Sequence, residues 1–378
     1  MIIASVVGAR PQFVKASAFS VAVAALNGSA GREVARDLLI HSGQHFDTGM
    51  SDVFFRQLGL PEPSYHLGVG GVAGHGAMTG LILERVEKVL QEIRPDVVLV
   101  YGDTNTTLAG ALAASKLGLP VAHVESGLRS GDRSMPEEIN RVVTDHLSAQ
   151  LFCPTAMAME NLSREGLAPG RGAVAGVHHV GDVMLDVALA HAHKGEEALE
   201  RLGLGELGRF ALCTVHRQGN VESPERLGNI FKALSEISWQ MPVVFPTHPR
   251  TARLAGEYGL CAPPGVLRMG PVGYFEMLGL LRASALVLTD SGGLQKEAYF
   301  FAKPCVTLRE ETEWVETVDS GCNMLGGADP ARIIHAARSL LDTAPDFSSR
   351  PYGDGTASRQ VLDILVETYG GRRAGRAR

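Results

Sequence analysis

The sequence predicts an α/β protein with doubly wound parallel sheets, and three observations lead to this fold class. Short runs of β-branched and other apolar residues recur along the whole chain, separated by stretches with helical periodicity. The runs are almost wholly apolar instead of alternating with polar residues, as expected of strands covered on both faces of a parallel sheet. Glycine supplies 44 of the 378 residues, against a usual share of ~7%, so many tight turns are expected between elements.

In the first half of the chain, three apolar runs are predicted to be strands that end in turns. They are Ile2–Val7 before Gly8, Asp96–Tyr101 before Gly102, and Pro120–Val124 before Glu125. The stretches between and after them either place apolar residues three or four positions apart or are rich in alanine, as helices do. The helices predicted here are Gly76–Ile93, Thr104–Leu117 and Glu137–Ala149.

The second half of the chain repeats the same alternation. Its predicted strands are Arg209–Val215, Pro242–Phe245, Ala285–Thr289 and Cys305–Leu308, and its predicted helices are Pro224–Ile237, Leu294–Phe301 and, near the end, about Ser358–Tyr369. Strands and helices that alternate over the whole length indicate an α/β architecture with parallel sheets.

The length suggests two domains, because a domain averages ~150 residues. Residues 167–177 are rich in Gly, Ala and Pro, and they precede a new series of strands and helices. We therefore place the domain boundary near Gly176, which gives a first domain of residues 1–175 and a second of residues 176–355. Residues 356–378 are predicted to be a C-terminal helix and basic tail, with the helix packing back on the first domain.

The charge distribution excludes some classes of partner. The formal net charge is −6, and four arginines stand in the last seven residues, so the remainder of the chain is more acidic still. We therefore expect no nucleic-acid partner for the body of the protein. The basic tail is interpreted as a solvated terminus, although it could also touch an anionic surface.

Cysteine and histidine usage indicates neither disulfides nor a metal site. The five cysteines are scattered without CxxC spacing, which suggests a reducing, cytoplasmic setting. His41 and His45 are four residues apart but flank Ser42-Gly43, and no HExxH motif occurs. The N-terminus lacks the basic region of a signal peptide, and no uninterrupted apolar stretch approaches the ~18 residues of a membrane helix. We expect no metal and no membrane association.

Polar residues gather just past the ends of the predicted strands. In open α/β sheets, ligands bind at the carboxyl ends of the strands. Any one such residue could simply be a solvated loop side chain, but eight in both halves of the chain suggest that they line one interdomain cleft. The eight residues are Arg10, His45, Asp103, Glu125, His216, His248, Ser291 and Arg309.

Two strand–helix junctions suit an anionic ligand. At residues 8–11, the backbone N–H groups and Arg10 would meet an anion at a helix N-terminus, and Lys15 follows about one turn later. At residues 289–293, two glycines allow a phosphate to approach the backbone, and the downstream carboxylate of Glu297 suits the hydroxyls of a ribose. The GxGxxG fingerprint is absent, so no nicotinamide or flavin cofactor is expected. The glycines predicted to be approached by a diphosphate or sugar are Gly8, Gly102, Gly292 and Gly293.

Three carboxylates in the first half are candidates for acid/base work. Asp103 and Glu125 follow strands, and Glu137 opens a helix after a proline. If they share one cleft, they could move protons on a bound substrate. Arg141, one helical turn after Glu137, is predicted to hold that carboxylate ionised. The alternative interpretation of Glu137 is ordinary placement of acidic residues at a helix N-terminus.

Together, these segments resemble the non-hydrolysing UDP-N-acetylglucosamine 2-epimerases from residue 1 to about residue 369. In the first half, the matching segments are residues 8–15 (GARPQFVK), 43–45 (GQH), 101–104 (YGDT), 123–129 (HVESGLR) and 136–141 (PEEINR). In the second half, they are residues 215–217 (VHR), 288–297 (LTDSGGLQKE) and 351–355 (PYGDG).

The resemblance implies a fold and a role for each matched residue. It implies two Rossmann-like domains facing across a cleft, the GT-B arrangement, with UDP bound mainly to the second. The diphosphate would be held by Ser291, Gly292 and Gly293 together with Arg10, with His216 near it, and the ribose by Glu297. The family's essential acids map onto Asp103, Glu125 and Glu137, and further active-site positions onto Lys15, His45 and Arg141.

The implied reaction interconverts UDP-GlcNAc and UDP-ManNAc. UDP leaves by anti elimination across C1–C2 to give 2-acetamidoglucal, and it then adds back as a proton reaches the opposite face of C2. This isomerase chemistry needs acid/base groups and cations beside the leaving diphosphate, but no cofactor. The resemblance further implies a UDP-sugar as the partner and a homodimer.

Two departures from the family pattern leave the sugar and the regulation open. Residues 312–316 read TEWVE where many members have TERPE, and the first motif reads GARPQ. Both forms resemble a branch that includes 2-epimerases of UDP-2,3-diacetamido-uronic acids. Gln44 and His248 match a site at which bacterial members bind a second UDP-GlcNAc, but Asp47 replaces another glutamine of that site. The alternatives from other classes are a GT-B glycosyltransferase, a non-catalytic UDP-sugar binding protein and a hydrolysing epimerase.

Overall fold

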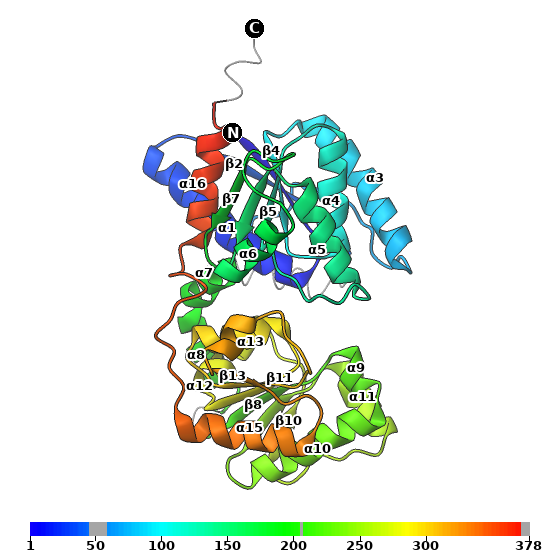
Figure 1. Ribbon diagram of the computed structural model, residues 1–378, viewed down its shortest axis with the longest axis vertical. Coiled ribbons are helices and arrows are strands. Elements are labelled where there is room, and N and C mark those ends of the chain that lie inside the picture. Colours follow the sequence, from blue (N-terminus) through cyan, green and yellow to red (C-terminus); the bar gives the residue numbers. More distant parts are fainter. Residues whose placement is uncertain (45–58, 205–206, 372–378) are drawn as a thin grey trace. The chain divides into compact units, whose positions relative to one another are not determined.

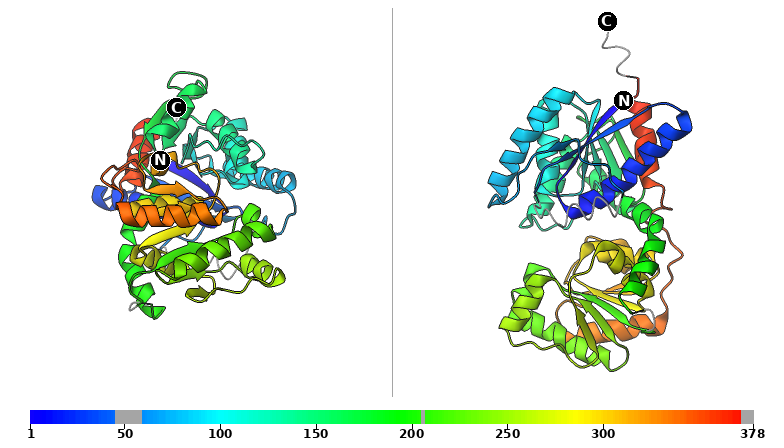
Figure 2. Two further views of the ribbon diagram at one scale, coloured as in Figure 1. Left: turned by 60° about the horizontal axis from the view of Figure 1, so that its bottom comes forward. Right: turned by 180° about the vertical axis from the view of Figure 1, so that it is seen from behind.

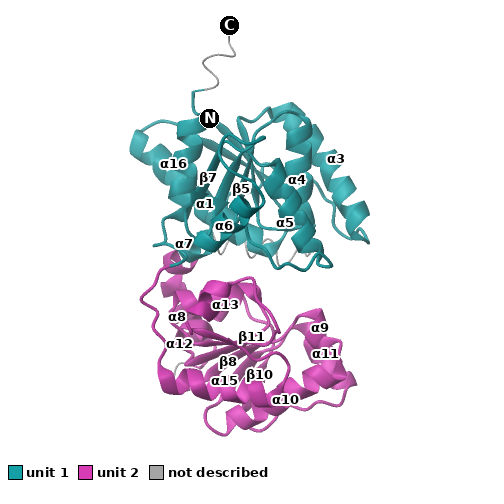
Figure 3. Ribbon diagram, in the orientation of Figure 1, with its two compact units in different colours: residues 1–187, 351–378 teal, residues 188–350 magenta. Residues whose placement is uncertain are grey.

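The computed structural model describes residues 1–44, 59–204 and 207–371, and it divides into two compact units (Figure 3). Unit 1 comprises Met1–Val187 and Pro351–Arg378, and unit 2 comprises Ala188–Arg350. Each unit contains one parallel sheet with helices on both faces (Figure 1).

The sheet of unit 1 has, within the described residues, seven parallel strands in the order β3-β2-β1-β4-β5-β6-β7. The strands are β1 (Ile2–Val7), β2 (Arg36–His41), β3 (Tyr65–His66), β4 (Val97–Tyr101), β5 (Val121–Val124), β6 (Gln150–Cys153) and β7 (Gly176–His179). From β1 the chain adds β2 and β3 on one side of the sheet. From β4 it adds β5, β6 and β7 on the other side. This confirms the doubly wound α/β class for this half of the chain.

The helices of unit 1 flank this sheet. They are α1 (Arg10–Ala30), α3 (His75–Ile93), α4 (Asn105–Lys116), α5 (Pro136–Leu147), α6 (Ala156–Arg164), α7 (Val183–Ala190), which ends in unit 2, and α16 (Ala357–Tyr369). Helix α16 lies beside α1, as both orientations show (Figure 2). The carboxylate of Asp186 accepts hydrogen bonds from the backbone N–H groups of Ala357 (3.1 Å) and Ser358 (2.7 Å), which ties the start of α16 to α7.

The sheet of unit 2 has six parallel strands among the described residues, in the order β10-β9-β8-β11-β12-β13. The strands are β8 (Ala211–Thr214), β9 (Val243–Pro246), β10 (Val266–Met269), β11 (Leu286–Thr289), β12 (Cys305–Thr307) and β13 (Asn323–Leu325). The helices are α8 (Ala192–Arg201), α9 (Gln218–Val221), α10 (Pro224–Ser238), α11 (Pro249–Glu257), α12 (Tyr274–Ala283), α13 (Gly292–Phe300), α14 (Val315–Asp319) and α15 (Pro330–Thr343).

Burial explains why the strands read as continuous apolar runs. In unit 2, Cys213 and Phe245 belong to the apolar cluster on one face of the sheet, whereas Leu212 and Val244 belong to the cluster on the other face. Neighbouring residues of one strand point to opposite faces, so a sheet covered on both faces buries every residue. Unit 1 builds a similar cluster between its sheet and α3 and α4.

The first sheet extends beyond the domain boundary predicted at Gly176. Strand β7 pairs with β6, with Gly176 opposite Gln150, and the two units divide after Val187. The Gly/Ala/Pro-rich stretch before Gly176 is therefore a loop that returns the chain from α6 to the sheet. Composition alone does not separate a loop within a domain from a linker between domains, because both are rich in turn-forming residues.

One described helix, α1, is long and apolar enough to cross a membrane on length and composition alone, with a mean hydropathy of 1.3. The sequence contains no uninterrupted apolar stretch of that length, but Arg10 and Lys15 are the only charged residues of this helix. In unit 1, α1 packs beside α16 and buries Phe13 and Phe19. The core helices of globular proteins share this composition.

A buried carboxyl group on β2 is predicted to make stability depend on pH. Burial raises the pKa of Asp37 to about 6, although the hydroxyls of Ser5 and Ser20 act in the opposite direction. Because the folded pKa exceeds the ordinary value of 3.8, the stabilisation from protonated Asp37 is complete below about pH 4 and is lost as the pH rises through about 6. Asp37→Asn is uncharged throughout, so its free energy of unfolding relative to wild type should rise by about 1–3 kcal/mol across this window.

Urea unfolding of the wild-type protein and of Asp37→Asn at about pH 4 and about pH 7.5 measures this difference in the free energy of unfolding. Ser20→Ala is the matched control, because it removes the hydroxyl 3.0 Å from the Asp37 carboxylate and leaves the charge in place. A stability difference between Asp37→Asn and wild type that stays constant with pH would show that Asp37 titrates normally.

Candidate active site

In each unit, several of the predicted site residues within the described parts of the chain follow strands beside the point where the strand order reverses: Asp103 follows β4, His216 follows β8 and Ser291 follows β11. This point lies between β1 and β4 in unit 1 and between β8 and β11 in unit 2. Ligands of open α/β sheets bind at this point, at the carboxyl ends of the strands, because the flanking connections leave in opposite directions there.

Glu125 and Lys15 form a buried ion pair at this edge of unit 1. Lys15 comes from the second turn of α1, and Glu125 directly follows β5 with a φ of +71°. A non-glycine residue in the left-handed region is uncommon and often marks a functional position. A small pocket adjoins the pair, and it is lined by Lys15, Val124, Glu125, Pro154 and the segment Gly181, Asp182 and Val183.

Asp103 pairs with Arg141, and Arg141 in turn pairs with Glu138. The Arg141 guanidinium donates to the carboxylate of Asp103 and, at 2.6 Å, to that of Glu138. Burial lowers the pKa of Arg141, but the two carboxylates outweigh burial and raise it. Burial also raises the pKa of Glu138, but the N–H of Ser130 and the Arg141 cation lower it overall. Asp103 keeps about a third of its side chain exposed, so solvent reaches it while Arg141 stays fixed.

The predicted pairing of Arg141 with Glu137 is wrong. Arg141 faces Glu138, three residues earlier on α5, and Glu137 makes no side-chain hydrogen bond or ion pair with the described parts of the chain. Residues three apart lie on the same helix face, as do residues four apart. Spacing alone therefore could not choose between the two neighbouring glutamates.

The junction after β1 differs from its predicted anion site. The side-chain oxygen of Gln12 accepts hydrogen bonds from the N–H groups of Gly8 (2.8 Å) and Ala9 (3.0 Å), so these donors are already used. A Cβ on Gly8 would collide with the hydroxyl oxygens of Ser42 and Thr106, which fill the space expected for a ligand. Arg10 is exposed at the first turn of α1.

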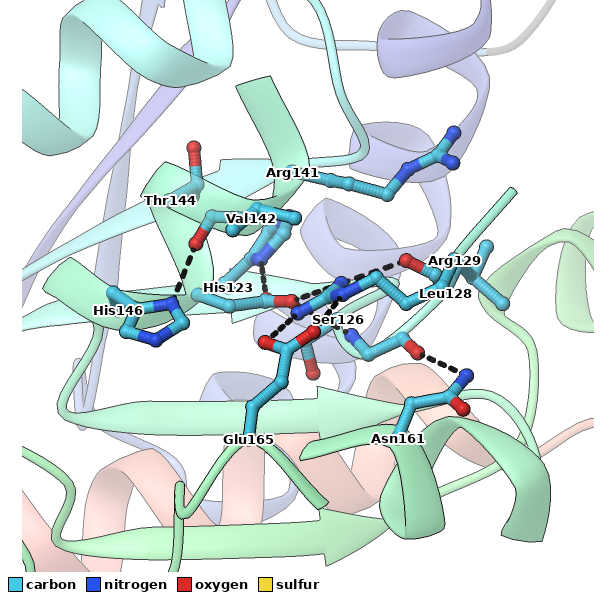
Figure 4. A network of polar contacts seen from close by, with 12 residues as sticks. His123, Ser126, Leu128, Arg129, Arg141, Val142, Thr144, His146, Asn161 and Glu165 are labelled. Atoms are coloured by element: carbon cyan, nitrogen blue, oxygen red, sulfur yellow. Dashed lines mark hydrogen bonds and ion pairs between the residues drawn. The ribbon is translucent and has the colours of Figure 1, made fainter. Parts of the chain in front are cut away.

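A polar network surrounds His123, whose side chain is fully buried, and extends to the partly exposed Arg129 and Glu165 (Figure 4). His123 on β5 places Nε2 2.7 Å from the carbonyl oxygen of Gly102 and Nδ1 2.7 Å from the carboxylate of Asp145 on α5. Asp145 also accepts from the N–H of Gly127 (3.1 Å) and from Arg129 (2.7 Å). Burial raises the pKa of Asp145, but His123 and Arg129 outweigh burial and lower it.

In unit 2, Asp290 organises the loop that carries His216. The Asp290 carboxylate is fully buried and accepts from the N–H groups of His216 (3.0 Å) and Arg217 (3.0 Å) and from the amide of Asn220 (3.1 Å). The His216 ring lies 3.4 Å from the same carboxylate and is 42% exposed. Partial burial lowers the pKa of His216; Asp290 opposes this shift, but Arg217 and His248 reinforce it. The direction of this shift of the pKa favours the neutral form of the ring.

The loop after β11 leads directly into α13. Ser291 is the N-cap, and Gly292 and Gly293 form the first turn of the helix. A Cβ on Gly292 would collide with the carboxylate of Glu313, so the space predicted there for a diphosphate is filled, whereas a Cβ on Gly293 would meet only the hydroxyl of Ser291 at 4.0 Å. Glu297 is buried one turn further along α13. Arg309, which follows β12, pairs with Glu313 at 2.9 Å.

The two residues of the candidate regulatory site lie in different units. The side-chain oxygen of Gln44 accepts from the N–H (3.0 Å) and hydroxyl (2.7 Å) of Thr106 in unit 1. His248 accepts from the N–H of Arg250 (3.2 Å) at the start of α11 in unit 2. His45, a predicted active-site residue, lies outside the described residues.

The part of the chain that the structure describes contains no group of three or more His, Cys, Asp or Glu side chains arranged to hold a metal ion. The five cysteines are free thiols, and Cys261 alone among them is exposed.

Four structurally important residues are not singled out by the sequence patterns. They are His123, Glu138, Asp145 and Asp290. His123 carries a signal, because it is a histidine in the middle of an otherwise apolar run, and Asp290 directly follows another strand. Asp145 has no such signal, since a helical carboxylate is usually solvated.

Comparisons with known proteins agree on one family. A family model described as UDP-N-acetylglucosamine 2-epimerase matches residues 30–366. A Pseudomonas aeruginosa protein named UDP-2,3-diacetamido-2,3-dideoxy-D-glucuronate 2-epimerase is 48% identical, and the match covers 97% of this chain and 100% of that protein.

Solved structures give the same result. The Methanocaldococcus jannaschii UDP-GlcNAc 2-epimerase in complex with UDP-GlcNAc and UDP matches with a TM-score of 0.86 and 39% identity, over 97% of this chain and 100% of that one. The Neisseria meningitidis UDP-GlcNAc 2-epimerase bound to UDP-GlcNAc matches with a TM-score of 0.85 and 27% identity, over the same shares of the two chains.

Proposed function

The chain belongs to the UDP-N-acetylglucosamine 2-epimerase family, and we propose that it interconverts UDP-GlcNAc and UDP-ManNAc without hydrolysing them. It is an isomerase with the two-domain, Rossmann-like fold of the GT-B type. The observation that carries the proposal is the pair of carboxylates, Asp103 and Glu125, each held by a buried cation at the strand-order reversal of unit 1.

In the proposed reaction, a carboxylate removes the proton from C2 of the sugar as the bond between C1 and the diphosphate oxygen breaks. UDP and 2-acetamidoglucal remain bound. A second acid then delivers a proton to the opposite face of C2, and the diphosphate oxygen attacks C1 again, so atoms and charge balance. Asp103 and Glu125 are the proposed acid/base groups, with Glu137 as a third, because each has a carboxylate that could exchange a proton with the sugar.

Unit 2 is proposed to hold UDP. Ser291, Gly292 and Gly293 present the N-terminus of α13 to the diphosphate, where the helix dipole favours negative charge. Glu297 would bind the ribose hydroxyls, and neutral His216 would donate to the leaving phosphate. Arg10, Lys15, His45 and Arg141 are proposed to contribute cations and hydrogen-bond donors from the first half of the chain.

A UDP-2,3-diacetamido-uronic acid is the second candidate substrate. The 48% identity to the Pseudomonas aeruginosa protein, over the whole of that chain, favours it. The same carboxylate machinery would serve both sugars, because the reaction at C1 and C2 does not involve the substituents at C3 and C5.

We also propose a cytoplasmic homodimer, and a regulatory site that includes Gln44 and His248. The cysteine usage supports the cytoplasm, and family resemblance supports the dimer and the regulatory site. Sedimentation analysis tests the dimer, and activity measured over a range of UDP-GlcNAc concentrations tests the regulatory site.

Proton NMR in D2O tests the proposed reaction. With UDP-GlcNAc, deuterium should appear at C2 together with the signals of the manno isomer, because the proton taken from one face is replaced from solvent on the other. A parallel sample with UDP-2,3-diacetamido-glucuronate decides between the sugars, and the substrate with the higher kcat/KM is the physiological candidate.

The other outcomes separate the alternative functions. Accumulation of free N-acetylmannosamine and UDP would indicate a hydrolysing epimerase, and sugar transfer only with an acceptor would indicate a glycosyltransferase. Binding of both UDP-sugars without exchange at C2 would indicate a binding protein and would refute the epimerase proposal.

A further inference from the structure

We propose that His123 is a positioning residue that holds Asp103 and Glu125 in one rigid frame through the peptide of Gly102; this inference rests on the proposed function. His123 is fully buried, and both of its ring nitrogens contact other groups of the chain. Its effect would be transmitted through the backbone that carries the two carboxylates.

Both ring nitrogens of His123 contact groups that only accept hydrogen bonds. Nε2 faces the Gly102 carbonyl oxygen, and Nδ1 faces the Asp145 carboxylate, each at 2.7 Å. A carbonyl oxygen and a carboxylate oxygen offer no proton to a ring nitrogen. A ring that carries protons on both nitrogens satisfies both contacts, and its positive charge then lies against the Asp145 carboxylate.

Gly102 is the residue through which this support reaches both carboxylates. Its N–H donates to the carbonyl oxygen of Val124 (3.0 Å), next to Glu125, and the residue that follows it is Asp103. A Cβ added to Gly102 would lie 3.1 Å from the carboxylate of Glu125 and 3.3 Å from the ammonium of Lys15. The glycine backbone therefore packs directly on the ion pair, and a movement of this peptide would shift both acid/base groups.

Asp145 extends the same support to the turn after Glu125. It fixes the N–H of Gly127 and the guanidinium of Arg129, while the N–H groups of Glu125 and Ser126 both donate to the carbonyl oxygen of Phe152 (3.1 Å each). Glu125 occupies the left-handed region, which a non-glycine residue keeps only where its surroundings impose it. The buried hydrogen bonds on both sides supply that constraint.

Two substitutions distinguish the two hydrogen bonds of the ring. The amide nitrogen of Gln overlays Nε2, so His123→Gln keeps the donor to Gly102. The amide nitrogen of Asn overlays Nδ1, so His123→Asn keeps the donor to Asp145 and leaves the Gly102 carbonyl without one. We expect His123→Asn to lower kcat by ~10²-fold with little change in KM, because small displacements of catalytic groups have effects of that size. We expect His123→Gln to retain most of the wild-type activity.

The matched control is Glu165→Gln at the outer end of the same network, where Glu165 pairs with Arg129 at 2.7 Å. It should lower the melting temperature and leave kcat unchanged. If the two His123 variants lose kcat equally, in proportion to their loss of stability, the role of His123 is structural and the proposal is overturned. Exchange at C2 by the wild-type protein is measured first, so failure of the proposed function is detected separately.

NMR of the wild-type protein with 15N-labelled histidine keeps the proposal testable if a variant does not fold. Two ring N–H protons of one histidine should resist exchange with water, and both signals should be missing in His123→Gln. Detection of only one such proton would show that the ring does not donate to both partners and would overturn the proposal.

Discussion

Asp103→Asn is expected to lower kcat by ~10²–10⁴-fold while KM for the UDP-sugar changes little. The substitution preserves the size of the side chain and removes its ability to take or give a proton. Arg141 keeps its second partner, Glu138, at 2.6 Å, so the guanidinium stays in place and the fold should be retained. Steady-state epimerisation and deuterium incorporation at C2 should fall together, because both require proton transfer.

Asp363→Asn on α16 is the matched control for this prediction. Asp363 also pairs with an arginine, Arg359 at 2.8 Å, but both side chains are more than half exposed. Exposed ion pairs contribute little to stability, typically ~0.5 kcal/mol, so this variant should behave as wild type. If Asp103→Asn retained kcat within about threefold of the control, Asp103 would not be an acid/base group of the proposed reaction.

Gly127→Ala is expected to destabilise the protein by about 2–4 kcal/mol, the largest stability effect that we predict for a single methyl group. Gly127 has a φ of +79°, where a Cβ is strained by about 1 kcal/mol. The new Cβ would also lie 2.8 Å from the carbonyl carbon of Ala158 and closer to its oxygen. These are backbone atoms of α6, so they cannot move aside as a side chain could.

Gly131→Ala separates the backbone strain at positive φ from the steric contact with Ala158. Gly131 has a similar φ of +76°, but nothing lies within 4 Å of the position that its new Cβ would take, so only the backbone strain remains. We expect this control to lose about 1 kcal/mol. Urea unfolding followed by circular dichroism measures both variants, and equal losses would show that the contact with Ala158 is relieved at no cost.

The agreement between sequence and structure is best where one strand is buried on both faces. The β4 run, Val97–Tyr101, is fully apolar and fully buried, and the sequence predicts its position to within one residue. Strand β2 (Arg36–His41) is not predicted, because it begins with charged Arg36 and Asp37 and lies near the sheet edge. Strand β7 resembles the start of a new domain in the sequence, because a glycine-rich loop precedes it.

The candidate site shows the same difference between what the sequence predicts and what only the structure reveals. Asp103, Glu125, His216 and Ser291 can be singled out from the sequence because each follows an apolar run, and the carboxyl ends of parallel strands meet at one edge. The side chains and backbone groups that these residues contact cannot be predicted from the sequence in this way. The choice of Glu138 over Glu137 for Arg141, and the use of the Gly8 N–H by Gln12, depend on side-chain directions and on packing between elements.

The local sequence therefore determines the alternation of strands and helices, the α/β class and the residues at the strand ends. These features depend on hydrophobic periodicity and on residues that are adjacent in the chain. Tertiary structure alone decides which side chains meet. His123, Asp145 and Gly102 come from β5, α5 and the turn after β4, and they converge only when the sheet has formed. Their hydrogen bonds join residues about 20 positions apart, a separation at which no sequence pattern specifies a partner.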